Sequence, residues 1–392
     1  MLSPRRLGFV FDRPLELRGW TTLDIGPDVP LSAVPACPAG DGPLRTLGTF
    51  IDATGRTHLR LGCCPSCGHV TYIDRPTLEW MNAYYLESWD GDDIETRGSS
   101  RERKLETSKK REKTVVTLAK ALDVDRARPV CEIGSGWGLS LRHLLDGGFK
   151  QVIGTETSKH RAGVVERALQ VPMITAPFES QECLRALAGH GPYSIILTNH
   201  VMEHTYDPER VLGAAAGLQE AGDYLIVAVP NQKTEQPMSV FFFLPHLHSF
   251  TRASLVRAAA RHGYAVIDDR HTGSKQLVYV FQKQRQPTGD NPASEEGIFE
   301  RTVEHYVRAF SLDRWRVGLR RLWWFRRGGP TGQRWMLGTG SLEERRWARI
   351  ASRNHYDDPR SVAIRSLWRR QTSAQESPFE IQFSGPVQLF VK

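Results

Sequence analysis

The sequence predicts an α/β protein built on a doubly wound, mostly parallel β-sheet, and three observations lead to this fold class. Strand-like apolar runs alternate with helix-like stretches between residues 128 and 284. The first run ends in a turn with glycines at alternate positions, Gly134, Gly136 and Gly138. The last two runs are joined by the short segment HTGS, which leaves no room for a crossover helix. We therefore expect these two strands to pair antiparallel.

The elements of this domain follow from the period of the apolar residues. Strands are predicted at residues 129–134, 151–156, 172–176, 193–199, 223–230, 264–270 and 275–283. Helices are predicted at residues 138–147, 158–169, 180–189, 207–220 and 251–263.

Four further segments flank this domain, 128–284. Residues 1–75 indicate a small module of short strands and turns around a cysteine cluster. Residues 76–127 are predicted to be a helical connector, with Val115, Val116, Leu118 and Leu122 at helical spacing. Residues 285–297 have the composition of a linker. Residues 298–392 form a basic, Trp-rich accessory region, predicted to be helical up to residue 370 and to end in a β-hairpin.

The composition is that of a globular protein of two or three units, with 392 residues of which 40% are hydrophobic. No stretch approaches the roughly 18–20 apolar residues of a membrane span. The N-terminus lacks the apolar region of a signal peptide, so we expect a cytoplasmic location. The chain has six cysteines, and several of them are clustered. In the cytoplasm a cluster of this kind indicates a metal site rather than disulfides.

The net charge of +8 is unevenly spread. Residues 285–392 hold 19 Lys and Arg against 12 Asp and Glu, together with six of the ten tryptophans. Four interpretations stay open: a grip for nucleic acid, a helix lying on a membrane surface, a site for an acidic substrate, and an Arg-rich domain that covers the sheet or forms an oligomer. The last is favoured, because a charge run is usually a solvated face.

The glycine turn at residues 134–138 suits a ligand that approaches the backbone closely. A dinucleotide fingerprint reads Gly-x-Gly-x-x-Gly. Here the third glycine comes one residue early and Leu139 occupies the dinucleotide position, which argues against NAD.

Two acidic residues sharpen the identity of the ligand. Glu132 precedes the glycines by two positions, and Glu156 ends the next predicted strand, where it could grip both ribose hydroxyls. Carboxylates in these places would repel phosphate. They suit a cofactor with a cationic amino group and no phosphate, which is S-adenosylmethionine.

Five blocks in order, VCEIGSGWG, VIGTETS, YSIILTNHVMEHTYDP, DYLIVAVPN and HLHSFTRASLVRAAARHGY, together resemble a class I S-adenosylmethionine-dependent methyltransferase over residues 105–283. The resemblance implies a methyltransferase enzyme with a Rossmann-like sheet of seven strands, the seventh antiparallel. It implies that the three glycines pass beneath the methionine part of the cofactor. It also implies that Glu132 orders this loop and the amino group of the cofactor, and that Glu156 holds the ribose. Asn199 and His200 should line the site near the transferred methyl group. Many relatives carry an acid after the third strand that contacts the adenine amino group. No residue here matches it clearly, and the candidates for this contact are Phe178 and Glu179.

The segment GCCPSCGHVTYIDRP resembles the N-terminal zinc ribbon of the sugar C-methyltransferases, where two Cys-x-x-Cys pairs bind zinc. Cys64 and Cys67 match the second pair, whereas the first reads Cys37-Pro-Ala-Gly40. Three interpretations stay open. Structural zinc is held by Cys37, Cys64 and Cys67 with a fourth ligand, the site is degenerate and empty, or the thiols are simply packed. The candidates for the fourth ligand are Cys63, Asp41 and His69.

The acceptor side is less defined. The sugar C-methyltransferases carry Tyr-x-Glu-His-Leu-x-x-Phe-Ser after the fifth strand, and here the same stretch reads Phe243-x-Pro245-His246-Leu-x-x-Phe-Thr. The loss of the tyrosine and glutamate weakens carbon methylation and leaves His246 as a candidate base, with packing or helix capping as the alternative. His200 and His204 in NHVMEH face the same choice.

We therefore expect methyl transfer to a small-molecule, sugar or glycan acceptor, as an oxygen methylation. The alternative is a nucleic-acid methyltransferase that grips its substrate with the basic C-terminal region. Three observations argue against it. The fourth strand ends in TNHVMEH rather than in the Pro-Pro motif of enzymes that methylate exocyclic amines of bases. No cysteine stands there to attack a pyrimidine ring, and no lysine tetrad of ribose methylation is in register. A cofactor-binding scaffold without catalysis is a third hypothesis. The oligomeric state is not predicted.

Overall fold

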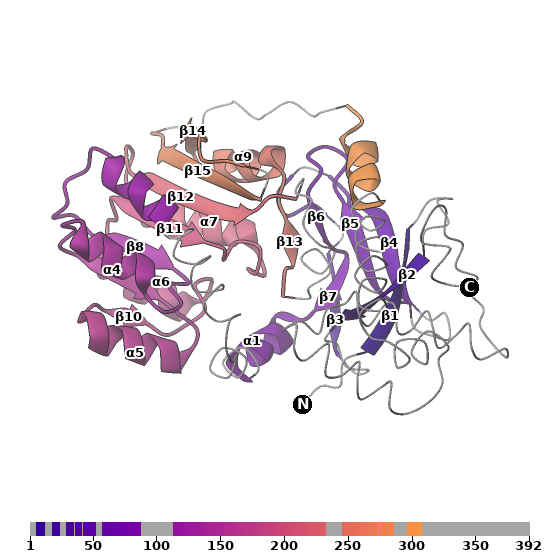
Figure 1. Cartoon of the computed structure of the whole chain (residues 1–392), viewed down its shortest axis with the longest axis horizontal. Coiled ribbons are helices and arrows are strands. Elements are labelled where there is room, and N and C mark those ends of the chain that lie inside the picture. Colours follow the sequence, from indigo (N-terminus) through magenta and orange to yellow (C-terminus); the bar gives the residue numbers. More distant parts are fainter. Residues whose placement is uncertain are drawn as a thin grey trace, which may run out of the picture.

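The structure is a computed structural model that describes residues 5–11, 18–23, 29–34, 36–40, 42–51, 57–87, 113–232, 245–273, 275–285 and 296–307. Two β-sheets form its two halves (Figure 1). A seven-stranded sheet with helices comes from the central part of the chain. A six-stranded sheet comes mainly from the N-terminal part and lies beside it.

The seven-stranded sheet has the strand order β10-β9-β8-β11-β12-β15-β14. Its strands are β8 (Val130–Ile133), β9 (Val152–Thr155), β10 (Met173–Ile174), β11 (Ile195–Asn199), β12 (Tyr224–Pro230), β14 (Tyr264–Asp268) and β15 (Gln276–Lys283). The pairs from β10 to β12 are parallel, whereas β15 runs antiparallel to both β12 and β14. The predicted fold class, including the antiparallel pairing across the short HTGS turn, is confirmed.

Helices cover both faces of this sheet, as its alternating side chains require. On one face, buried side chains of α6 (Gln181–Ala188), α7 (Pro208–Gly217) and α9 (Arg252–Arg261) form a core with strand residues such as Ile196 and Val227. On the other face, α4 (Leu139–Asp146), α5 (Lys159–Leu169) and the helix at 113–121 pack on neighbours such as Leu197 and Ile226. The predicted apolar stripe of the 113–121 helix lies in this second core.

Side-chain caps define where four of these helices begin. Ser158, Ser180, Asp207 and Thr251 each accept a hydrogen bond from a backbone N–H of the first turn. Such caps satisfy donors that the helix itself leaves unpaired, and each is worth about 1 kcal/mol. The first residue of each of these helices is therefore set by a capping residue in the local sequence.

The N-terminal half is an antiparallel sheet with the order β13-β6-β5-β4-β1-β2. Its strands are β1 (Arg5–Phe11), β2 (Arg18–Leu23), β4 (Arg45–Ile51), β5 (Thr57–Cys63), β6 (Val70–Tyr72) and β13 (His248–Ser249). A separate pair is formed by β3 (Leu31–Ala33) and β7 (Asp74–Pro76), and α1 (Leu78–Glu87) follows. Phe50, Leu59 and Tyr72 belong to the core of this half.

β13 connects the two halves. It comes from the segment after β12 of the seven-stranded sheet, and it pairs with β6 of the six-stranded sheet. His248 lies opposite Thr71 in this pair, and the Thr71 hydroxyl donates to the carbonyl of Leu247. The Thr251 hydroxyl also donates to the carbonyl of Cys67, at 2.6 Å. The segment that precedes α9 is therefore held by the N-terminal sheet.

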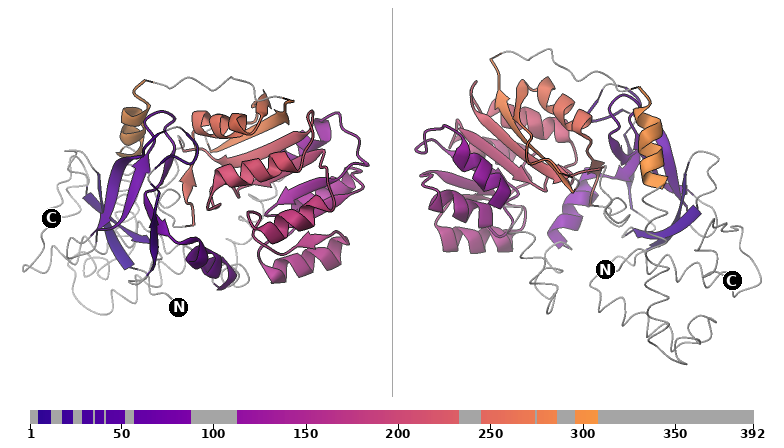
Figure 2. Two further views of the ribbon diagram at one scale, coloured as in Figure 1. Left: turned by 180° about the vertical axis from the view of Figure 1, so that it is seen from behind. Right: turned by 45° about the horizontal axis from the view of Figure 1, so that its top comes forward.

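The helix at 298–307 packs on the N-terminal sheet, which both views of Figure 2 place beside it. Phe299, Val303 and Tyr306 join the core of that sheet. The guanidinium carbon of Arg45 lies 3.8 Å from the centre of the Phe299 ring. The rest of the predicted basic region, residues 308–392, and its closing hairpin lie outside the described residues.

No helix within the described ranges is long and apolar enough to cross a membrane.

Candidate functional site

The glycine turn joins β8 to α4 at the carboxyl edge of the parallel sheet, where ligands bind in folds of this type. Gly134, Gly136 and Gly138 have φ angles of 67°, 52° and 71°, in the left-handed region that favours glycine. The turn is tied to the next strand, because the backbone N–H of Ser135 donates to the carbonyl of Thr155 at 2.9 Å. The backbone is therefore fixed before any ligand arrives.

Close approach explains two of these glycines, and open space distinguishes the third. A Cβ atom at Gly134 would lie 2.5 Å from Val201, and one at Gly138 would lie 2.7 Å from Val165. A Cβ atom at Gly136 would meet none of the described residues within 4 Å. Among these residues, the backbone at Gly136 is thus open on the side where a side chain would project.

The two predicted acids flank this turn and are both buried. Glu132 lies in β8, whereas Glu156 follows β9 directly. The carboxylate of Glu156 accepts from the backbone N–H of Gly136 at 2.9 Å and from that of Ser158 at 3.0 Å. Glu156 therefore connects the glycine turn to the start of α5. Oε1 of Glu156 also accepts from the hydroxyl of Thr157, at 3.5 Å.

Asn199 ends β11, and His200 follows it directly, beside the strand that leads into the glycine turn. Asn199 Oδ1 is buried and has no hydrogen-bond partner among the described residues. His200 has a φ of 58°, an unusual conformation for a non-glycine residue, and its N–H donates to the carbonyl of Ala228. Strained residues of this kind concentrate at functional sites. The following residue, Val201, is the neighbour that Gly134 must avoid.

A cluster of a carboxylate and three histidines lies directly after this strand end. Glu203 is 1% exposed, and its Oε1 lies 3.1 Å from His200 Nδ1 and 3.9 Å from His204 Nε2. The His204 and His246 rings meet edge to face with centres 4.6 Å apart. Burial raises the pKa of Glu203, but the contacts with His200, His204 and His246 lower it by more, to about 2. Glu203 is therefore a buried anion.

α1 and the segment before β13 both contact the cluster through hydrogen bonds to one backbone carbonyl. His204 Nδ1 lies 3.0 Å from the carbonyl oxygen of Pro245. The Tyr85 hydroxyl donates to the same carbonyl at 3.3 Å. Burial lowers the pKa of His204 and raises that of Tyr85. Glu203 and Tyr85 were not singled out from the sequence. Glu203 had a signal in the acidic residue of NHVMEH, but Tyr85 had none.

The two residues suggested for the adenine position have other contacts here. Phe178 is part of the apolar core beside α6. The Glu179 carboxylate accepts from the backbone N–H groups of Tyr206 and Asp207, at 3.0 and 3.4 Å, just ahead of α7. Burial raises the pKa of Glu179 to about 7. Its visible role is to hold the segment that leads from the histidine cluster into α7.

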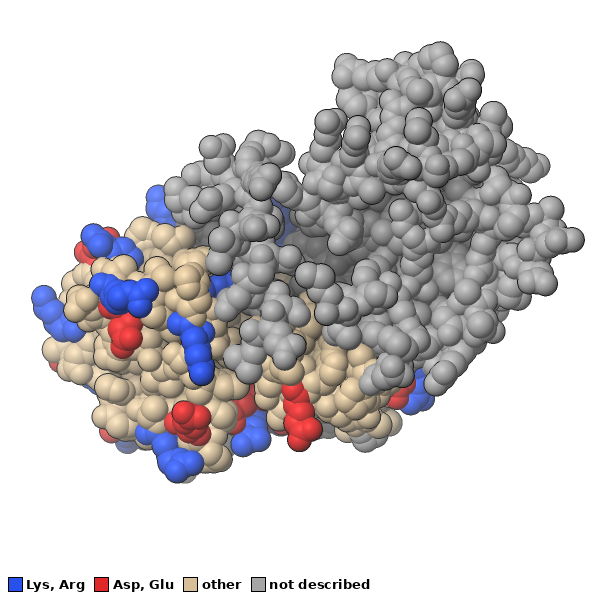
Figure 3. All heavy atoms as spheres, turned by 90° about the horizontal axis from the view of Figure 1, so that it is seen from below, with Lys and Arg blue, Asp and Glu red and all other residues tan. Residues whose placement is uncertain are grey.

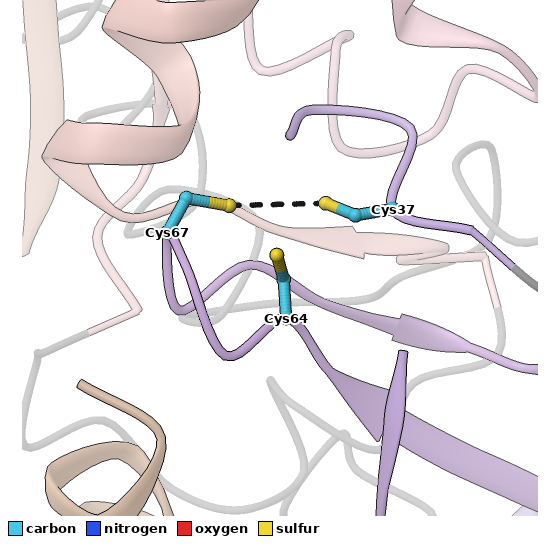
Figure 4. Close-up of side chains that lie close together, drawn as sticks. All are labelled: Cys37, Cys64 and Cys67. Atoms are coloured by element: carbon cyan, nitrogen blue, oxygen red, sulfur yellow. Dashed lines mark hydrogen bonds between the residues drawn. The ribbon is translucent and has the colours of Figure 1, made fainter. Parts of the chain in front are cut away.

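The three cysteines singled out in the sequence meet at the junction of the two halves (Figure 4). Cys37, Cys64 and Cys67 are buried, and their sulfur atoms all lie within 4.8 Å of one another. The sulfur atoms of Cys37 and Cys67 are 3.8 Å apart. Two thiolates on a tetrahedral zinc ion, with Zn–S bonds of about 2.3 Å, are separated by about 3.8 Å. This geometry fits zinc.

Gly40 occupies the fourth corner of this cluster. A Cβ atom there would lie 2.9 Å from the sulfur of Cys67 and 3.3 Å from those of Cys37 and Cys64. Contacts from Cys37 and Cys67 lower the pKa of Cys64, whereas contacts with Cys64 and Cys67 and burial raise the pKa of Cys37.

The three candidates for a fourth ligand differ in position. Cys63 points into the other core, with Leu61 and Tyr72. His69 is buried against His248, with Nε2 3.0 Å from His248 Nδ1. Asp41 lies outside the described residues. No fourth His, Cys, Asp or Glu joins the three thiols within the part of the chain that the structure describes.

Comparison with known proteins gives one family match. Residues 102–269 match the model of a methyltransferase domain. No curated protein matches the chain.

Solved structures with a similar arrangement include methyltransferases. One is the magnesium protoporphyrin IX methyltransferase ChlM from Synechocystis PCC 6803 with bound S-adenosylmethionine. It is 13% identical, covers 53% of this chain and 96% of its own, and has a TM-score of 0.40. Another is the CcbJ methyltransferase from Streptomyces caelestis. It is 16% identical, covers 44% of this chain and 89% of its own, and has a TM-score of 0.36.

The family match covers six of the seven strands of the sheet, all except β15, and the antiparallel β15 is the seventh strand that the sequence blocks implied. The glycine turn and the two buried acids lie within the matched range. The chain therefore contains a methyltransferase domain at residues 102–269, with the fold of the class I S-adenosylmethionine-dependent methyltransferases.

Proposed function

We propose that the protein methylates a hydroxyl oxygen of a small molecule, a sugar or a glycan. The observation that carries this proposal is the buried Glu203 with its three histidines, directly after the strand end that adjoins the glycine turn. A hydroxyl group keeps its proton at neutral pH, so it is an acceptor that gains from a neighbouring imidazole. An acceptor bound here would lie near the cofactor.

The cofactor roles carried over from the sequence form part of the proposal. The glycine turn would pass beneath the methionine part of S-adenosylmethionine, which the open space at Gly136 supports. Glu132 would order the turn and the amino group, and Glu156 would accept from the ribose hydroxyls. Asn199 would line the cofactor with the amide oxygen that has no partner among the described residues.

His200 and His246 are the proposed proton acceptors. The side chain of His200 can be oriented by Glu203 through the 3.1 Å contact at Nδ1, the arrangement by which a carboxylate positions a general base. His246 belongs to the same cluster and is half-buried, as are His200 and His204. The leaving thioether is neutral, so these residues need only position the acceptor and receive its proton.

We also propose that Cys37, Cys64 and Cys67 hold a structural zinc ion. The 3.8 Å separation of two sulfur atoms and the burial of all three support it. Buried thiolates at the junction of two sheets leave little access for a substrate. The ion would therefore stabilise the junction rather than take part in methyl transfer.

Transfer of labelled methyl groups tests the acceptor class. The purified chain is incubated with methyl-labelled S-adenosylmethionine and an extract of its source, and the label is traced into small-molecule, lipid-glycan, protein and nucleic-acid fractions. Label in a small-molecule or glycan fraction, in a bond stable as a methyl ether, is the expected result.

Label in RNA or DNA would overturn the proposal in favour of the nucleic-acid alternative. Binding to RNA that weakens steeply with salt would accompany that outcome. On the face drawn in Figure 3, the described residues carry Lys and Arg interspersed with Asp and Glu. The charge excess that motivates the alternative belongs to residues 285–392, most of which lie outside the described ranges.

A further inference from the structure

We propose that Glu203, His204 and His246 form a binding site for a divalent transition-metal ion. One donor atom of each residue lies within 4.8 Å of the donor atoms of the other two. The site is separate from the cysteine cluster in both residues and donor chemistry. The inference deepens the proposed function, on which it rests for the acceptor. With the ion bound, His246 is a metal ligand, and His200 alone remains to receive the proton of the acceptor.

The carboxylate of Glu203 is the first observation that points to a cation. The side chain is 1% exposed, and Oε1 lies 3.1 Å from His200 Nδ1. In contrast, Oε2 is buried and has no hydrogen-bond partner within the described part of the chain. A buried carboxylate oxygen without a donor carries a large desolvation cost, which a bound cation offsets.

The tautomer of His204 is the second observation. The carbonyl oxygen of Pro245 can only accept, so His204 Nδ1, at 3.0 Å, carries the hydrogen. In the neutral ring Nε2 is then the unprotonated nitrogen, and it faces Glu203 Oε1 at 3.9 Å. Two electron-rich atoms that face each other are stabilised by a positive ion between them. A histidine held by a backbone carbonyl through its other nitrogen is also the usual arrangement of a metal ligand.

His246 completes the set from a different part of the chain. Its ring lies edge to face with His204 at 4.6 Å, and it is half-buried while Glu203 is fully buried. Bonds of about 2.0–2.2 Å to a tetrahedral ion place donor atoms about 3.4 Å apart. The donor atoms now lie within 4.8 Å of one another, so side-chain movements of at most about 1.4 Å close the site.

The donor set determines which ions fit and what they could do. Two imidazoles and one carboxylate suit Zn²⁺, Fe²⁺, Co²⁺ or Mn²⁺ and disfavour Ca²⁺. Three protein ligands leave at least one coordination position, on the half-buried side of the cluster. An acceptor with an oxygen donor, such as a hydroxyl group, is the class of substrate that could occupy it.

Binding of Co²⁺ to the chelator-stripped full-length chain tests the site, because its optical spectrum separates the two clusters. Thiolate ligands give an intense charge-transfer band in the near ultraviolet, whereas histidine and carboxylate ligands give only the weaker visible bands. We expect two equivalents of Co²⁺ in the unchanged protein under reducing conditions. His246→Ala should bind one equivalent fewer and keep the full thiolate band.

Two further variants make the result specific. Glu203→Gln keeps the size of the side chain and should weaken the second equivalent by tenfold or more. His190→Ala, at an exposed histidine outside the cluster, should bind two equivalents as before. Each variant is checked for folding by its thermal unfolding. A single equivalent in the unchanged protein, with the thiolate band, would overturn the proposal, as would two equivalents in folded His246→Ala.

The same preparations separate this inference from the proposed function. Methyl transfer to a hydroxyl acceptor that is unaffected by removal of the second ion would refute the metal site's part in the reaction and leave the proposed function standing. If the second Co²⁺ binds normally but the methyl label appears only in nucleic acid, the proposed function is refuted and the metal site stands.

Discussion

The cysteine cluster and the histidine cluster offer the same number of metal-binding side chains within the same 4.8 Å, yet they differ in two physical respects. The cysteine cluster is fully enclosed, with Cys64 and Cys67 at 0% exposure, whereas His204 keeps 19% of its side chain exposed. The first offers soft thiolates and the second offers nitrogen and oxygen. Closed thiolate sites hold structure together, and partly open sites with nitrogen and oxygen donors bind substrates. Burial and donor type together, rather than geometry alone, separate the two roles.

Replacing a ligand in each cluster should produce opposite effects, and this is the largest expected difference. Cys67→Ser should remove the metal from the cysteine cluster and destabilise the junction by about 3 kcal/mol or more, or about 10 °C in thermal unfolding. His246→Ala should change the unfolding temperature little and reduce methyl transfer. Calorimetry, elemental analysis and labelled transfer measure the three quantities.

The matched control for Cys67 is Cys183, a buried cysteine of α6 outside both clusters. Cys183→Ser should leave the metal content unchanged. Equal stability losses in folded Cys67→Ser and Cys183→Ser, with no change in metal content, would mean that the three thiols are merely packed.

A substitution in the glycine turn should abolish transfer without disturbing either cluster. Gly136→Ala places a methyl group in the open space beneath the proposed cofactor, at a φ of 52° that costs about 1–2 kcal/mol. Affinity for S-adenosylhomocysteine, measured by calorimetry, should fall by more than tenfold while metal content stays the same.

Gly222→Ala is the control for this backbone strain. Gly222 also has a positive φ, of 99°, and open space around it. This variant should lose stability but keep its affinity for S-adenosylhomocysteine. Equal losses of affinity in the two variants would show that strain, not occupation of the cofactor space, causes the effect.

Filling the space at Gly40 should weaken the cysteine site. In Gly40→Ala the added Cβ would lie 2.9 Å from the sulfur of Cys67 and 3.3 Å from those of Cys37 and Cys64, so it would compete with an ion for the space between the thiols. We expect the metal to be released to a chelator about tenfold faster, measured under reducing conditions. An unchanged release rate would indicate that the ion does not use the space beside Gly40.

The smallest effect concerns Glu179, a half-buried carboxyl whose pKa shift, unlike that of Glu203, does not come from neighbouring histidines. Its pKa is raised from 4.5 to about 7, so the folded protein binds this proton more tightly than the unfolded chain. Stability is therefore lost as the pH rises from about 4.5 to 7. Glu179→Gln should remove this loss and be more stable than the unchanged protein by about 1–2 kcal/mol at pH 8. Urea unfolding at pH 8 and pH 4 measures it, and a difference that persists at pH 4 would contradict this explanation.

The sequence was sufficient for the methyltransferase fold because its signals are local. The seven strands and five helices between residues 129 and 283 lie within a few residues of their predicted bounds. The glycines at 134, 136 and 138 all have the positive φ that their spacing suggested. Apolar period, helix caps and glycine conformation each act over a few residues, so each can be read directly from the chain.

The candidate site was only partly predictable because it depends on distant contacts. His204 and His246 meet across 41 intervening residues, and β13 pairs with β6, some 178 positions away, although two residues give no strand signal of their own. Cys63 is instructive in another way. It ends β5 next to Cys64, and adjacent residues of an extended chain point to opposite sides, so strand alternation alone disfavours it as a fellow ligand.

The shared strand β13 has a consequence for how such enzymes can diversify. The residues that present His246 to the methyltransferase domain are hydrogen-bonded to a strand that the N-terminal module supplies. An exchange of that module between two chains would replace β6 and Tyr85, which support the proposed acceptor side, and would leave His246 itself in place. Recombination at the boundary before residue 113 should therefore change which acceptors are chosen, even when every residue of the cofactor domain is inherited intact.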